Sequence, residues 1–66
     1  MSQAFVRESG GRPRIFETRE SAESNLELQK IMDGERYTFE VRGRENGGYM
    51  IARLAKSGAF DSWVEE

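Results

Sequence analysis

The sequence contains no cysteine and no histidine. Without cysteine the chain cannot form a disulfide, and without either residue type it lacks the side chains that most often bind zinc. Catalysis is affected too, because histidine is the usual general acid or base near neutral pH, and nucleophilic serine or cysteine commonly works beside it. We therefore expect a protein that is not an enzyme and that holds no cofactor or metal.

Long hydrophobic runs are also missing, since the apolar stretches are only a few residues long. This excludes a transmembrane span and the core of a signal peptide, and we expect a cytoplasmic protein without membrane contact. With 66 residues the chain has room for one domain, which buries roughly 60% of the surface that its unfolded form exposes. Its stability must come from a small core or from a partner.

Charge is present in both signs but is unevenly distributed. The formal net charge is −2. Residues 17–35 carry six acidic side chains against Arg19 and Lys30, and eight of the ten basic residues in the chain are arginine. The sequence therefore predicts an acidic surface on one part of the domain and an arginine-rich surface on another.

The first half of the chain predicts a hairpin followed by a helix. Residues 4–8 and 14–18 are short runs of strand-forming residues, and glycine, serine and proline between them are typical of a turn. Residues 20–33 follow a helical period, with a core-facing stripe made of Leu28, Ile31 and Met32. The sequence allows two helix starts: a cap at Thr18 or Ser21 gives a longer helix, and the capping box of residues 24–27 gives a shorter one. Asp33-Gly34 supplies the exit from the helix.

The second half predicts a hairpin between residues 37–42 and 49–54. Asn46-Gly47 is a strong signal for a two-residue type I′ turn, and this turn pairs Val41 with Ala52 and Glu40 with Arg53. Moving the tip to Gly47-Gly48 keeps the same faces. The face directed to the core then consists of alternating apolar residues: Tyr37, Phe39, Val41, Met50, Ala52 and Leu54.

A second turn at Ser57-Gly58 predicts a final strand over residues 60–65. A two-residue loop would set Trp63 beside Ala52 on the core face, whereas a longer loop through Ala59 would shift this placement. The predicted fold class is α+β, a single domain with an antiparallel β-sheet and one helix packed on it, in the order β-β-α-β-β-β.

Two surfaces are candidates for binding. In the predicted register, an apolar patch rimmed by arginine lies on the face of the sheet opposite the core. Its mixture of aromatic residues and arginine is typical of interface hot spots. Its members are Arg42, Arg44, Tyr49, Ile51, Arg53, Phe60 and Val64. The second surface is the acidic side of the helix, with Glu20, Glu23 and Glu27, which suits a basic groove on a partner. A solvated sheet face and a solubilising helix face are the ordinary alternatives for these surfaces.

In its small size, acidity, lack of cysteine and histidine, and mixed hairpin, helix and sheet order, the chain resembles the small phage and mobile-element inhibitors of the anti-CRISPR type. The resemblance implies binding to a host nucleoprotein machine, and it rests on overall character, so no functional residue is carried over. Our leading hypothesis is a non-catalytic module that inhibits or adapts a protein or nucleoprotein partner. The alternatives are a nucleic-acid-binding domain that uses the arginine and aromatic face, disfavoured by Glu40 and Glu45 on that surface, and a homodimeric structural subunit.

Overall fold

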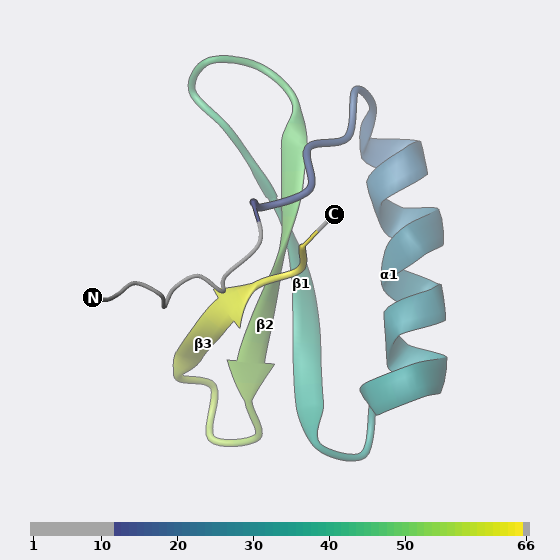
Figure 1. The fold of residues 1–66 in the computed structure, drawn as a ribbon, viewed down its shortest axis with the longest axis vertical. Coiled ribbons are helices and arrows are strands. Elements are labelled where there is room, and N and C mark those ends of the chain that lie inside the picture. Colours follow the sequence, from purple (N-terminus) through teal and green to yellow (C-terminus); the bar gives the residue numbers. More distant parts are fainter. Residues whose placement is uncertain (1–11, 66) are drawn as a thin grey trace, which may run out of the picture.

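The computed structural model of this protein describes residues 12–65 (Figure 1). The chain forms four elements in this order: α1 (Arg19–Asp33), β1 (Tyr37–Gly43), β2 (Tyr49–Ala55) and β3 (Phe60–Trp63). The strands form one antiparallel sheet in the order β1-β2-β3, and α1 packs mainly against β1 and also against β2. The predicted α+β class, with one helix on an antiparallel sheet, is confirmed.

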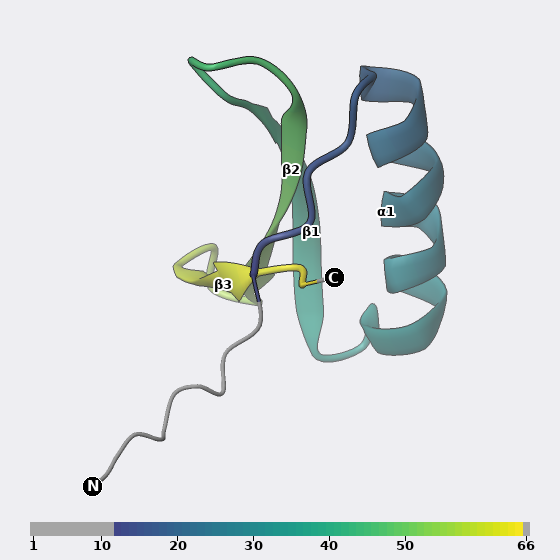
Figure 2. The same ribbon diagram turned by 45° about the horizontal axis from the view of Figure 1, so that its top comes forward.

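The predicted order β-β-α-β-β-β is wrong, because the described residues run from the helix into three strands. The predicted strand at 4–8 lies outside the described residues. Residues 14–18 do not form a strand, although Phe16 exchanges two backbone hydrogen bonds of 2.8 and 2.9 Å with Tyr49. Pro13 forms a second isolated bridge, with Glu65. Figure 2 shows this segment crossing from the start of α1 to the end of β3.

Thr18 is the N-cap of helix α1, so the longer of the two predicted helices is confirmed. The Thr18 hydroxyl accepts a hydrogen bond of 3.1 Å from the Ser21 backbone N–H, which satisfies one of the unbonded N–H groups at the helix start. The helix ends at Gly34, whose backbone is right-handed (φ −63°). A side chain at Gly34 would collide with the Lys30 carbonyl oxygen, so glycine is favoured there by space and not by a left-handed turn.

The predicted core stripe of the helix is wrong. Leu28, Ile31 and Met32 are 50%, 81% and 59% exposed. The side that faces the sheet is formed instead by Ala22, which is completely buried, and Leu26, which is half-buried. Large side chains from the sheet and from the segment before α1 already fill the core, so the helix contributes a small residue at its closest approach.

The hairpin of β1 and β2 is shifted by one residue from the predicted register. Val41 lies opposite Ile51, and Glu40 lies opposite Ala52. The loop has three residues between Arg44 and Gly48: Gly47 N–H donates to the Arg44 carbonyl (3.2 Å), and Arg44 N–H donates to the Gly48 carbonyl (3.0 Å). In the described chain only glycines have positive φ, including Gly47 and Gly48, so Asn46 does not adopt the type I′ conformation.

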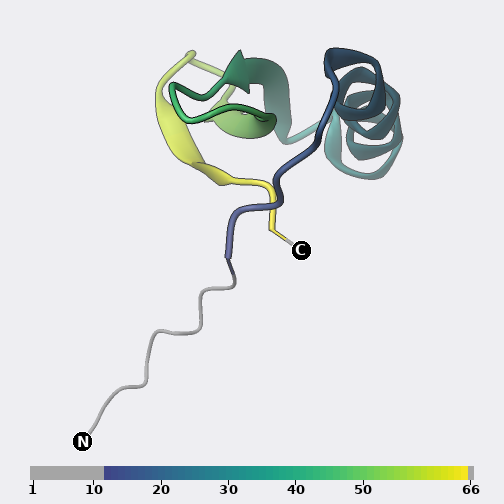
Figure 3. The ribbon, with the colours of Figure 1, turned by 90° about the horizontal axis from the view of Figure 1, so that it is seen from above.

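A shift of one residue reverses which side chains of β2 face the helix. The core lies between α1, the sheet and the segment that leads into α1, which Figure 3 shows passing between the helix and β3. Its buried members are Phe16, Ala22, Ile51 and Val64, with Leu26, Phe39, Val41 and Tyr49 packed against them. Met50, Ala52 and Leu54 were predicted on the face towards the helix and by alternation lie on the other face of the sheet. Ala52 is still completely buried there, opposite Trp63.

Strand β3 is shorter than predicted. Trp63 lies opposite Ala52 as expected, but both are on the face turned away from α1, and a bulge sets Phe60 opposite Leu54. The loop runs through Ala59, whose carbonyl accepts a 2.8 Å hydrogen bond from Ala55 N–H. The Phe60 and Trp63 rings contact edge to face, with centroids 5.0 Å apart.

Candidate partner-binding surfaces

The predicted arginine and aromatic patch does not form as one exposed surface. Ile51 is completely buried and Val64 is 4% exposed, so both belong to the core. Tyr49 packs against this core, while Phe60 is 49% exposed and lies by alternation on the opposite face of the sheet. The cause is the one-residue shift of the hairpin, which turns the odd-numbered residues of β2 towards the helix.

Arg53 has a structural role in the sheet. Its Nη1 donates to the Ser62 hydroxyl (3.2 Å), and its guanidinium lies 5.3 Å from the centre of the Tyr37 ring. Arg53 therefore connects β2 to both neighbouring strands. The predicted pair between Glu40 and Arg53 does not form; Glu40 instead accepts a 3.1 Å hydrogen bond from Arg42 on its own strand.

Other arginines are also used within the domain. The Arg19 guanidinium lies 5.5 Å from the centre of the Tyr49 ring, and that of Arg14 lies 4.9 Å from the Phe16 ring. Arg44 donates a 3.2 Å hydrogen bond from Nη1 to the Gly47 carbonyl and so stabilises the loop that follows it. Of the arginines predicted to bind a partner, Arg42 is the one that is exposed on the sheet face away from α1.

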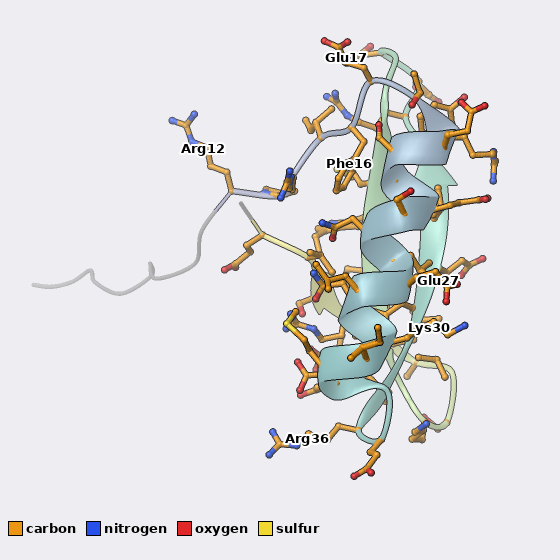
Figure 4. All side chains as sticks on the ribbon, turned by 90° about the vertical axis from the view of Figure 1, so that its right-hand side faces the viewer. Arg12, Phe16, Glu17, Glu27, Lys30 and Arg36 are labelled. Atoms are coloured by element: carbon orange, nitrogen blue, oxygen red, sulfur yellow. The ribbon has the colours of Figure 1, made fainter. Side chains whose placement is uncertain are left out.

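The predicted acidic residues of the helix are exposed. Glu23 pairs with Arg19 (3.5 Å) and Glu27 pairs with Lys30 (3.6 Å), both pairs lying along the helix. Such exposed pairs contribute little to stability. Figure 4 views α1 from outside and shows Glu27 and Lys30 on its solvent-facing side. Glu20 is exposed in the first turn, where a negative charge favours the positive end of the helix dipole.

Three large apolar side chains lie among these charges. Leu28, Ile31 and Met32 form a continuous exposed stripe at i, i+3 and i+4 spacing, which we call the helix patch. Helical periodicity singles out these three residues but predicts them in the core. The signal for the correct assignment was a second stripe, Ala22, Leu26 and Gln29, which has the same helical period and fewer large side chains.

Two open grooves border the helix patch. The first runs between the segment before α1 and the helix, and Ile15, Phe16 and Leu28 line it. The second runs between the end of α1 and β1, and Ile31, Tyr37 and Phe39 are among its lining residues. Ile15 is itself 48% exposed, so apolar surface extends from the patch across the first groove.

Comparison with protein-family models, with curated proteins and with solved structures finds no match to this chain. The residues that the structure describes contain no group of three acidic side chains placed to bind a metal ion together. Nor does this part of the chain contain a helix with the length and apolar character needed to cross a membrane. The function is therefore inferred from the exposed surfaces.

Proposed function

We propose that this domain is a non-catalytic binding module that docks helix α1 into an apolar groove of a protein partner. The exposure of the helix patch supports this proposal most directly, with Ile31 at 81% and neither Leu28 nor Met32 below 50%. Anchors at i, i+3 and i+4 are the usual pattern by which a helix binds in a groove. Truncation of such an anchor commonly weakens binding by about 1–2 kcal/mol or more.

The charges around the helix patch define the chemistry of the partner. Glu20, Glu23 and Glu27 are exposed on the same helix, so the groove that receives α1 carries basic residues at its rim. The apolar anchors supply most of the affinity, and the carboxylates accelerate association and select against acidic partners. Occupation of the groove would exclude its ordinary ligand, which is how a module of this kind inhibits or adapts the protein it binds.

A protein partner is favoured over nucleic acid. Binding to a phosphate backbone draws on several basic groups gathered on one surface. Arg42 is paired with Glu40 at 3.1 Å, while Arg19 and Arg53 lie against tyrosine rings. The exposed side of α1 is acidic and would repel a polyanion.

The test uses the immobilised full chain to capture a partner, followed by affinity measurements with the purified components. Leu28→Gln, Ile31→Gln and Met32→Gln together should weaken binding at least about 100-fold, since each replaces an anchor by a polar residue that keeps the helix. Phe60→Gln is the matched control, because Phe60 and Leu28 are 49% and 50% exposed on different surfaces.

Charge reversal of Glu20, Glu23 and Glu27 to lysine should chiefly slow association, and added salt should reduce the difference from the unaltered chain. Equal affinity of the chain and its triple glutamine variant would refute the proposal. Loss of binding on Phe60→Gln alone would move the site to the sheet, and capture that nuclease abolishes would identify nucleic acid as the ligand.

A further inference from the structure

Strand β1 has an open edge in the described part of the chain, because the sheet order gives it β2 as its only strand neighbour. On β2, Tyr49 and Ile51 form backbone hydrogen bonds to Phe16 and Val64, on the side away from β1. Since bonding direction alternates along a strand, the even-numbered residues of β2 bond to β1. The odd-numbered residues of β1 therefore direct their peptide groups to the open edge.

Two of the usual devices against edge pairing, a proline and a bulge, are missing from β1. Its seven residues, YTFEVRG, contain no proline, and its register with β2 has no bulge. Natural proteins commonly protect an edge strand by these devices or by covering it, because an open edge is a template for another strand. Its charges are Glu40 and Arg42, two residues apart and of opposite sign. The edge is therefore suited to a partner with the reversed charge order.

We propose that β1 pairs in antiparallel fashion with β1 of a second copy, about a two-fold axis at Val41. In this register Glu40 of each copy lies opposite Arg42 of the other, which forms two ion pairs across the interface. Hydrogen-bonded positions then fall on odd residues, as the open edge requires. Pairing centred on Glu40 or on Arg42 would oppose like charges, so the charges select the register.

The surroundings of β1 suit this pairing. Tyr37, Phe39 and Val41 are only half-buried on the helix-facing side, and a second strand would cover more of their surface. The groove between the end of α1 and β1 lies beside this edge. A domain of 66 residues has a small core, so apolar surface buried across a dimer would add to its stability. The product is a continuous six-stranded sheet.

This inference is independent of the proposed function. Leu28 lines the groove on the other side of α1, beside Ile15 and Phe16, so the dimer leaves this part of the helix patch open. Arg42 and Glu40 currently pair along one strand at 3.1 Å and are both well exposed. Exchange of their partners between copies therefore needs little rearrangement of the fold.

The test measures the mass of the full chain by sedimentation over a wide range of concentrations. The unaltered chain should approach twice its 7.6 kDa mass. Glu40→Arg and Arg42→Glu should each weaken self-association roughly tenfold or more, because each creates like-charge contacts at both pairs. An equimolar mixture of the two variants should restore a dimer, as should the chain that carries both substitutions.

Circular dichroism melts show whether each variant is folded before its mass is interpreted. A chain that stays at 7.6 kDa throughout would overturn the dimer. A dimer whose single charge variants associate as strongly as the unaltered chain would overturn pairing through β1, and so would a mixture that stays monomeric. Partner binding by the charge variants separates the two proposals, since a monomer with an intact helix patch still docks α1.

Discussion

The two faces of helix α1 differ in a way that reverses the common arrangement. Towards the sheet, Ala22 is completely buried and the Gln29 and Asn25 side chains are joined by a 3.0 Å hydrogen bond. Towards solvent, the same helix carries Ile31 at 81% exposure beside Leu28 and Met32. A surface helix ordinarily turns its large apolar residues to the core. Since the inner face packs without them, the outer residues are available for contacts beyond this chain.

The largest difference in stability is expected between two isoleucines: Ile51, on β2 in the core that the inner face of α1 covers, and Ile31, on the outer face of α1. Ile51→Ala should lower the free energy of unfolding by about 2–5 kcal/mol, because it leaves a cavity at a fully buried position. Ile31→Ala should change it by less than about 0.5 kcal/mol, since Ile31 is mostly exposed. Urea denaturation at low protein concentration measures both. A comparable loss at Ile31 would mean that the helix patch is buried in solution.

A smaller contrast is expected when the inner face of the helix is enlarged. Ala22→Leu should destabilise the domain by about 1–3 kcal/mol, because the added carbons have no space beside Phe16 and Ile51. Ser24→Leu, at an exposed position of the same helix, should change the free energy of unfolding by less than about 0.5 kcal/mol. Thermal melts compare the two variants. An Ala22→Leu variant as stable as the unaltered chain would contradict the close packing of α1 against the sheet at Ala22.

The bounds of the elements could be predicted because their signals are local. Residues 20–33 were expected as helix and Arg19–Asp33 is observed, since a capping threonine and a terminal glycine act within one turn. The alternation that begins at Tyr37 likewise defined β1. Such signals depend on neighbours in the chain and not on the rest of the fold.

The register of the hairpin could not be predicted in the same way. Asn46-Gly47-Gly48 is compatible with loops that differ by one residue, and the choice involves a distant segment. A Cβ at Gly48 would lie 2.9 Å from the Ile15 Cγ2 atom and 3.1 Å from the Phe16 carbonyl oxygen. The segment before α1 therefore packs directly on this loop. That tertiary contact favours the observed loop and reverses the predicted faces of β2.

The candidate site was predicted in part. Glu20, Glu23 and Glu27 were expected on an exposed helix face and lie there, because charged residues are seldom buried without partners. The apolar half of the site was missed, since helical periodicity measures the spacing of large side chains and not their fit. Packing against Phe16 favours the stripe that contains Ala22.

The smallest difference in stability is expected between variants at the two possible starts of α1, Thr18 and Ser24. The start matters for the inner face because Ala22 belongs to the helix only if the helix begins before it. Thr18→Ala should lower the free energy of unfolding by about 0.5–2 kcal/mol, because the Ser21 N–H loses its hydrogen bond to the Thr18 hydroxyl. Ser24→Ala should be neutral or slightly stabilising, because Ser24 lies inside the helix and alanine has the higher helix propensity. Urea denaturation with helical circular dichroism as the signal compares them. The opposite ranking would start the helix at Ser24, leave Ala22 outside it, and remove the inner face on which the contrast between the two sides of α1 depends.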